Sequence, residues 1–295
     1  MLPQMRHVLL IVLVLSLSLS CTAQNHPTNS AKSAKVDPAE QLHWRLGMQA
    51  WTFRKLTLYE TIDQCNKLGV RYIEMYPGQK LSPEQNVKAD HNMSGEQIDL
   101  LIAKLKSANV TAVSYGVVDM GKDEASARKV FEFAKKLGLD EVVAEPPPEQ
   151  MAMLDNLTEE YHIKLAIHDH PKPSRYWNPD FVLQACQGRS NRIGACADVG
   201  HWYRSGLVPV ECLKKLNGRI IELHMKDVDE NKEDVVWGTG KVDIRGVLEE
   251  IKRQGIQNPL FAIEYEKGEG QELIDNVSKS IQYFNTLCAE LAAQK

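Results

Sequence analysis

The sequence predicts a single-domain α/β protein, a closed (β/α)8 barrel of the TIM-barrel type. One unit, a short apolar run followed by a loop and an amphipathic segment, recurs eight times. The length of 295 residues suits one such barrel, of about 250 residues, after an N-terminal leader. The Gly-x-Gly-x-x-Gly loop that an open, doubly wound sheet normally carries after an early strand does not occur. These three observations favour the closed barrel.

The apolar, β-branched runs are predicted as strands and the amphipathic segments as helices. The strands are expected at residues 46–52, 71–76, 110–116, 140–145, 163–168, 193–198, 219–225 and 260–265. The helices are expected at residues 57–68, 95–107, 123–137, 148–160, 178–187, 209–217, 243–254 and 270–291. The second helix has apolar residues at i, i+3, i+4 and i+7 from Ile98 to Leu105, and Ser94 with Gln97 forms a capping box before it.

The N-terminus has the pattern of a secretory signal. Arg6 precedes an apolar run and then a Ser/Leu stretch that ends at Cys21, so residues 1–21 are predicted as a signal peptide of the lipoprotein type, with Cys21 lipidated. Ordinary cleavage after Ala23 is the alternative. Residues 22–42 are polar and predicted as a flexible tether, and residues 43–295 as the barrel. Both alternatives place the protein in the bacterial cell envelope, as a periplasmic protein or outer-membrane lipoprotein.

The composition restricts the partners. The formal net charge is -4, so the protein lacks the positive charge that nucleic-acid binding requires, and no nucleic-acid partner is predicted. The expected partner is a small molecule. Membrane contact is expected only through the lipid anchor. The sequence makes no prediction of an oligomeric state.

Ionisable side chains gather where the predicted strands end. In barrels the active site lies at the C-terminal ends of the strands. Six of the eight strands deliver such groups: Glu74, Glu145, His168-Asp169-His170, Asp198 with His201, His224 with Lys226, and Glu264 with Glu266. Burying so many ionisable groups together is costly unless a metal or a substrate pairs them. Imidazoles and carboxylates without thiolates predict one divalent metal ion, Mn, Mg, Co or Zn.

Three motifs resemble a known family. The segments RIGACADVGHW (192–202), IELHMKDV (221–228) and FAIEYE (261–266) resemble the last three strands of the xylose isomerase-like sugar phosphate isomerase/epimerase family. The resemblance implies a TIM barrel with one divalent metal held by residues of strands five to eight. It implies that Asp198, His224 and Glu264 are metal ligands and that His201 contacts the substrate.

The fifth strand departs from the family pattern. Where the family usually shows Glu-Asn-His, this chain shows His168-Asp169-His170, so His168 replaces the first metal-binding Glu. The family's epimerases use two metal-bound glutamates on opposite sides of the substrate carbon, which leaves Glu264 as the one such base here. Either Glu145 replaces the missing base, or the reaction needs one base, with His170 or Lys226 as the acid.

Further residues are assigned to the substrate. Trp51 and Trp202 are predicted to stack on a sugar ring. Glu74, at the end of the second strand, is assigned to substrate binding as well. The loops after the seventh and eighth strands show no basic cluster, so the predicted sugar is unphosphorylated.

Three functions follow as hypotheses. The first is a metal-dependent sugar isomerase or epimerase that abstracts a proton next to a carbonyl, with Glu264 as base. The second is a lyase or hydratase of a keto-sugar or keto-glycoside that uses the same metal site. The third is a glycan-binding lipoprotein without catalysis, which the replacement of a glutamate by His168 suggests.

Overall fold

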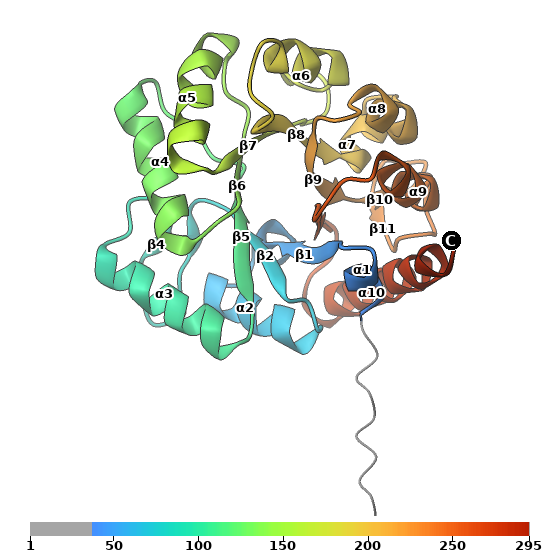
Figure 1. The fold of residues 1–295 in the computed structure, drawn as a ribbon. Helices are drawn as coiled ribbons and strands as arrows, with labels where there is room; N and C mark the ends of the chain where they lie inside the picture. The colour runs from blue at the N-terminus through green and yellow to red at the C-terminus, as the bar shows by residue number, and fades with distance from the viewer. Residues whose placement is uncertain (1–36, 295) are drawn as a thin grey trace, which may run out of the picture. The chain divides into compact units, whose positions relative to one another are not determined.

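The computed structural model describes residues 37–294, which contain a closed barrel with helices around it (Figure 1). The eight barrel strands are parallel, and neighbours follow the order β1-β12-β9-β8-β7-β6-β5-β2. Their bounds are Arg45–Gln49 (β1), Tyr72–Met75 (β2), Thr111–Tyr115 (β5), Glu141–Ala144 (β6), Lys164–His168 (β7), Ile193–Asp198 (β8), Ile220–Met225 (β9) and Leu260–Ile263 (β12). The predicted fold class is confirmed, and each predicted strand has its counterpart.

The predicted helices are present too. They are Leu58–Lys67 (α2), Gly95–Ser107 (α3), Glu124–Leu137 (α4), Met151–Tyr161 (α5), Pro179–Cys186 (α6), Pro209–Lys215 (α8), Ile244–Gln254 (α9) and Gly270–Ala293 (α10). The capping box of Ser94 and Gln97 forms as predicted at the start of α3. Gly138 ends α4 with a φ of 72°, a left-handed conformation that glycine adopts without steric cost.

Several short elements lie outside the predicted pattern. They are helices Pro38–Gln41 (α1) and Val199–Arg204 (α7), the 3-10 turns Ala50–Phe53 (η1) and Pro148–Gln150 (η2), and the strands Gln79–Lys80 (β3), Lys88–Ala89 (β4), Asp227–Val228 (β10) and Asp234–Val235 (β11). Helix α1 lies within the predicted tether 22–42 and packs against α10, so ordered structure begins before residue 43. The first strand ends at Gln49, earlier than predicted, because η1 follows directly.

Both faces of the barrel strands are buried, as expected for a parallel sheet covered by helices. β8, β9, β6 and β12 consist entirely of buried residues. The described cysteines are all buried and unpaired: Cys65, Cys186, Cys196, Cys212 and Cys288. In the barrel interior, however, three glutamates are buried among the apolar residues, Glu74, Glu141 and Glu222.

Within residues 37–294, no helix is both long and apolar enough to span a membrane. The predicted signal peptide and the lipidation site Cys21 lie outside the described residues, so both stay predictions.

The loop between β9 and α9 is held by one buried carboxylate. Asp227 accepts hydrogen bonds from the backbone N–H groups of Gly238 (2.8 Å), Gly240 (2.9 Å) and Val242 (3.0 Å). The preceding residue, Lys226, makes its ion pairs elsewhere. Asp227 therefore fixes the β10–β11 hairpin and the loop that follows it.

We expect Asp227→Ala to lower the free energy of unfolding by about 3 kcal/mol, because it leaves three backbone donors without their acceptor. The matched control is Asp229→Ala. Asp229 lies on the same hairpin and accepts two backbone N–H groups, but these bonds are exposed, so the loss should stay below about 1 kcal/mol. Urea denaturation measures both. Equal losses would contradict the assigned role of Asp227.

Candidate active site

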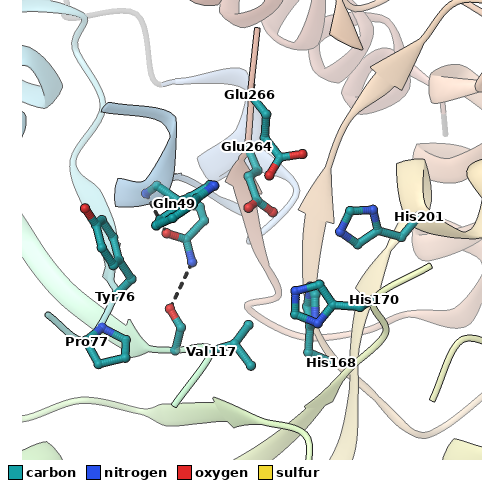
Figure 2. Close-up of a pocket in the computed structure, with 11 residues that line it drawn as sticks. Gln49, Tyr76, Pro77, Val117, His168, His170, His201, Glu264 and Glu266 are labelled. Carbon is teal, nitrogen blue, oxygen red and sulfur yellow. Dashed lines mark hydrogen bonds between the residues drawn. The ribbon is translucent and has the colours of Figure 1, made fainter. Parts of the chain in front are cut away.

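A pocket of about 400 Å³ opens at the carboxyl ends of the barrel strands (Figure 2). This is where active sites lie in barrels of this type. The pocket is lined by Gln49, Trp51, Tyr76, Pro77, Gly116, Val117, His168, His170, His201, Glu264 and Glu266. Figure 2 shows Glu264 and Glu266 together on one wall, with the three histidines grouped on another.

The four predicted metal ligands converge at this pocket. His168 ends β7, Asp198 ends β8, His224 lies on β9, and Glu264 follows β12. One potential ligand atom from each lies within 4.8 Å of the others, and all four residues are buried. Two of the four, His168 and Glu264, also line the pocket, so the cluster borders the space where a substrate would bind.

A carboxylate fixes the orientation of the His168 ring. Its Nδ1 lies 3.1 Å from Oε1 of Glu145, which follows β6. Its Nε2 faces the cluster, 3.7 Å from Oδ2 of Asp198, and this buried nitrogen has no hydrogen-bond partner. A carboxylate on one imidazole nitrogen, with the other nitrogen left free, is the usual arrangement of a metal-binding histidine.

His224 repeats this arrangement with its nitrogens exchanged. Its Nε2 lies 2.6 Å from Oε2 of Glu74 at the end of β2. Its Nδ1 faces the cluster, 2.9 Å from Oε2 of Glu264, without a hydrogen bond of good geometry. Burial alone would lower the pKa of the His224 imidazole, but the carboxylate of Glu264 raises it above its usual value.

The placement of Glu74 corrects its assignment to the substrate. Its side chain is fully buried, and it is not among the residues that line the pocket. The residue is on the strand face that points into the barrel, where it meets His224. Glu74 is therefore a positioning residue behind the cluster.

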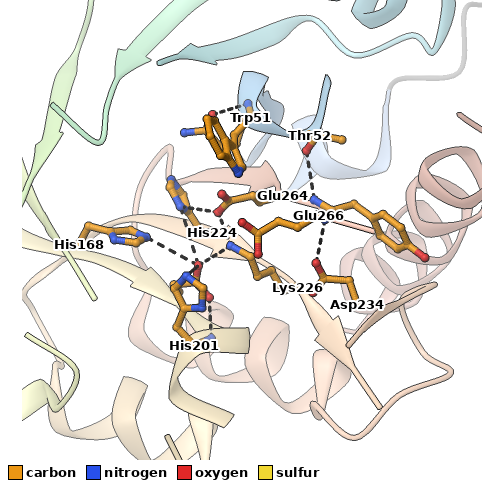
Figure 3. Close-up of polar contacts among 12 residues, drawn as sticks. Trp51, Thr52, His168, His201, His224, Lys226, Asp234, Glu264 and Glu266 are labelled. Carbon is orange, nitrogen blue, oxygen red and sulfur yellow. Dashed lines mark hydrogen bonds and ion pairs between the residues drawn. The ribbon is translucent and has the colours of Figure 1, made fainter. Parts of the chain in front are cut away.

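Lys226 holds the two carboxylates of the cluster. Its ammonium lies 2.6 Å from Oδ2 of Asp198 and forms an even shorter ion pair with Oε2 of Glu264 (Figure 3). Burial would lower the pKa of Lys226, but these two carboxylates raise it well above its ordinary value. The lysine is buried and does not line the pocket. Its position suits the pairing of charges and does not suit the predicted role of Lys226 as the acid that protonates the substrate.

Gly200 makes room for this lysine. A Cβ atom added at Gly200 would lie 2.5 Å from Cβ of Lys226, closer than such atoms approach in proteins. The Gly in the segment after β8 is thus explained by the close approach of β9.

The two carboxylates are ionised at neutral pH. Burial would raise the pKa of Asp198, but neighbouring positive charge, that of the Lys226 ammonium included, holds it well below its usual range. Burial would likewise raise the pKa of Glu264, but Lys226 and His224 lower it. The second oxygen of Asp198 accepts the backbone N–H of His201 at 2.7 Å, which fixes the carboxylate at the start of α7.

These residues fit a divalent cation. Two buried imidazole nitrogens without a hydrogen-bond partner and two ionised carboxylates are close enough to share one ion. A donor set of nitrogen and oxygen atoms without sulfur suits borderline or hard divalent ions. His168, Asp198, His224 and Glu264 would hold the ion.

Glu145 contacts two of the histidines from outside the pocket. Its Oε1 accepts the backbone N–H of His170 at 3.0 Å and lies 2.5 Å from Nδ1 of the same residue. Burial would raise the pKa of Glu145, but hydrogen bonds with His168 and His170 hold it far below its usual range. Glu145 does not line the pocket, so its predicted role as a second base is not supported by its position. His170 lines the pocket, and half of its side chain is exposed.

His201 lines the pocket, and its contact with the substrate stays a prediction, whereas Trp202 does not line the pocket. Nδ1 of His201 lies 3.2 Å from a guanidinium nitrogen of Arg204, and burial holds the pKa of the imidazole well below its usual value. His201 is therefore neutral, with Nδ1 as acceptor and Nε2 as donor. Trp202 is fully buried in the core because α7 turns it away from His201, which corrects its assignment to sugar stacking.

Trp51 keeps a position suited to stacking. It lies on η1, is 40% exposed, and lines the pocket. Tyr76 meets it edge to face at 5.0 Å between ring centroids.

Several pocket residues were not predicted from the sequence: Gln49, Tyr76, Pro77, Gly116 and Val117. Glu266 was predicted at the end of the eighth strand without an assigned role, and it lines the pocket. Gln49 bonds the carbonyl of Gly116 through its Nε2 at 3.1 Å. Gln49 and Tyr76 lie within or at the end of predicted strands, and that location is the one sequence signal that points to them.

Comparison with known proteins gives the family. The model of the family described as "Xylose isomerase-like TIM barrel" matches residues 62–287. No curated protein matches the chain in sequence. A crystal structure of an uncharacterised protein from Parabacteroides distasonis ATCC 8503 is 34% identical, with 83% of this chain and 99% of that chain covered and a TM-score of 0.69.

Two further solved structures have lower sequence identity to this chain. One is described as a sugar epimerase and the other as a protein like a sugar epimerase. A D-tagatose 3-epimerase-like protein is 18% identical, covering 84% of this chain and 98% of its own, with a TM-score of 0.65. A D-psicose 3-epimerase from Clostridium cellulolyticum H10, with D-tagatose, is 13% identical, covering 83% and 99%, with a TM-score of 0.63. At these identities the likeness shows a shared fold.

Removal of single ligands tests the metal site. We expect Asp198→Ala and His224→Ala each to lower the metal content strongly while the barrel stays folded, because both side chains point to the rim cluster rather than the apolar core. Metal analysis of protein purified without chelator, with circular dichroism, measures this. Glu250→Ala on α9 is the control, since Glu250 pairs only with neighbouring residues of its own helix. Unchanged metal content in both ligand variants would refute the assignment.

The nature of the fourth ligand is testable at position 168. His168→Glu replaces a neutral donor by an anionic one, so we expect preference to shift from Zn or Co toward Mn or Mg. Metal affinity should also fall as the pH falls, because the raised pKa of His224 makes protons compete with the metal. Competition between metals, followed by mass spectrometry at several pH values, measures both effects.

A crystal structure with the metal bound would test directly whether His168 is a ligand. If Nε2 of His168 lies over roughly 3 Å from the ion, where a Zn–N bond is about 2.1 Å, the residue is not a ligand.

Proposed function

From the premise that the chain belongs to the xylose isomerase-like TIM barrel family, we propose that it is a metal-dependent isomerase or epimerase of an unphosphorylated sugar. The observation that carries the proposal is the cluster of His168, Asp198, His224 and Glu264 at the edge of a polar pocket. Solved structures that share this fold include sugar epimerases.

The pocket supports a neutral ligand. The residues that line it include two glutamates and three histidines, and among these described lining residues there is no Lys or Arg. A phosphate dianion placed there would meet two carboxylates and no lysine or arginine to pair with it. Hydroxyl groups of an unphosphorylated sugar suit the same lining, and the secretory pattern of the N-terminus suits a sugar met outside the cytoplasm.

Glu264 has the position of the base. Its Oε2 is held by Lys226, and Oε1 has no partner among the described residues. The low pKa of Glu264 keeps the carboxylate free to accept a proton. A divalent cation bound at the cluster would polarise the sugar carbonyl and make the neighbouring C–H more acidic. Glu264 removes that proton in the proposed reaction.

His170 is the second proton carrier. Glu145 holds its Nδ1, which leaves Nε2 toward the pocket. The histidines and the glutamates occupy different walls of the pocket (Figure 2). When its ring carries a proton on both nitrogens, His170 can deliver the Nε2 proton: delivery on the face away from Glu264 inverts the carbon, whereas delivery to the neighbouring carbon isomerises the sugar. Neutral His201 can donate a hydrogen bond to a substrate oxygen.

A second function uses the same groups. Both carboxylates of the pocket lie on one wall, and His170 lies on the other wall with Glu145 behind it. The protonated imidazole of His170 is suited to protonate a leaving oxygen. Abstraction of a proton by Glu264 followed by loss of that oxygen would make the protein a lyase of a keto-sugar or keto-glycoside, and the reverse would be a hydration.

Deuterium incorporation separates these functions and tests the base. Sugars incubated with metal-loaded protein in D₂O should gain deuterium at one carbon without losing a group if the protein is an isomerase or epimerase, whereas a lyase or hydratase gives an unsaturated or hydrated product. We expect Glu264→Gln to slow either reaction by a factor of about 100 to 10,000 while protein stays folded. The control is Glu250→Gln, which alters a glutamate outside the pocket. NMR and mass spectrometry measure both.

Two outcomes would contradict the enzymatic proposal. Glu264→Gln with unchanged exchange would remove the base. Glycan binding that persists in chelator, with no turnover of any sugar, would instead support a glycan-binding protein without catalysis.

A further inference from the structure

The active pocket is followed by a second cavity on the far side of His170. This second cavity has a volume of about 380 Å³ and lies among the loops that follow β5, β6 and β7. It shares two lining residues, Val117 and His170, with the active pocket. Shared walls make the two spaces neighbours, so a ligand longer than one ring can occupy both. Each volume falls at the lower end of the range of ligand pockets, roughly 300 to 1,000 Å³.

The second cavity differs in character from the active pocket. Val118, Met120 and Pro146 give it buried apolar surface, and none of the four clustered metal ligands lines it. Five of its ten lining residues are polar: Asp119, Glu145, Gln150, His170 and Arg175. Apolar surface beside hydrogen-bonding groups suits a ring that carries hydroxyl groups or another polar substituent, which must be bound and oriented but need not react.

His170 stands on the border between the two spaces. Its backbone N–H and its Nδ1 are both held by Oε1 of Glu145, which fixes the ring. Its ring also stacks on His201 at 5.5 Å between centroids. Nε2 has no partner among the described residues and is the ring's remaining hydrogen-bonding atom. An oxygen that joins a ring in one cavity to a ring in the other must pass beside this histidine.

We propose that the second cavity is a subsite for a second ring, joined through a glycosidic oxygen to the sugar in the active pocket. The substrate class is then a disaccharide or another glycoside rather than a free monosaccharide. The inference rests on the proposed function, since the metal cluster and Glu264 define the place of the first ring. The second ring can be a second sugar or an aromatic aglycone, and the two are distinguished by the choice of glycoside in the titration that follows.

Calorimetric titration of the full-length, metal-loaded protein tests the subsite. The probes are D-glucose and D-galactose, their phenyl β-glycosides, and the disaccharides cellobiose and lactose. We expect a glycoside to bind about tenfold more tightly than its monosaccharide, or better. A gain with the phenyl glycosides alone identifies an aromatic second ring, and a gain with the disaccharides identifies a sugar.

Filling the second cavity should remove this gain. Asp119→Trp and Gln150→Trp place an indole at two different points of its lining, so a variant that fails to fold by circular dichroism leaves the other available. In the folded variants the glycoside should bind no more tightly than the monosaccharide, whose affinity should not change. Gln184→Trp is the control, because it adds the same ring at an exposed position of α6 that lines a third cavity and not the second.

Three results would overturn the subsite. They are the absence of any gain for glycosides with the unmodified protein, a gain that survives in the folded cavity-filling variants, and an equal loss with Gln184→Trp. Binding is measured without turnover. Failure of deuterium exchange therefore refutes the proposed function alone, and failure of the glycoside gain refutes the subsite alone.

Discussion

The buried contact of the Lys226 ammonium with Asp198 and Glu264 organises the carboxyl end of the barrel. Removing charges from water costs several kcal/mol for each ion unless the ions are paired. The lysine follows β9, which lies between β8 and β12 in the sheet, so one cation links the ends of three neighbouring strands. Because of this pairing the two carboxylates stay ionised and are held in place, which the chemistry of the pocket requires. Gly200 is part of the same constraint, since only a residue without a Cβ lets the lysine stem pass.

A second layer of carboxyl groups holds the imidazoles. Glu145 orients His168 and His170, and Glu74 orients His224. Burial raises the pKa of Glu74 and of its neighbour Glu222 well above the usual range, which favours the neutral form of both carboxyl groups. The interior layers of barrels usually hold branched apolar residues, and here buried acids replace some of them. Glu74 therefore positions His224 through a hydrogen bond, whereas the ionised carboxylate of Glu145 positions His168 and His170.

The strands and the metal cluster could be predicted from the sequence because each rests on a local rule. Apolar runs give the strands, and the location of barrel sites at strand ends selects His168, Asp198, His224 and Glu264. The direction of a side chain at a strand end has no such rule, which is why Glu74 was misassigned. Trp202 was misassigned because α7 is a short helix without a readable period, and it sends Trp202 into the core. Gln49 and Tyr76 are uncharged at neutral pH, so the pattern of charged groups at the strand ends does not indicate them.

The replacement of a glutamate by His168 changes the charge of the cluster as well as its shape. Two carboxylates, two imidazoles and the ammonium of Lys226 leave a single net negative charge when the imidazoles are neutral, half of what a third carboxylate would give. A less anionic ligand set neutralises less of a bound cation's charge, so more of that charge remains to act on a substrate carbonyl. The same change removes one base from the pocket. In the proposed reaction the carbonyl is therefore strongly polarised and an imidazole handles the second proton, and His170 with Glu145 behind it has the position for that role.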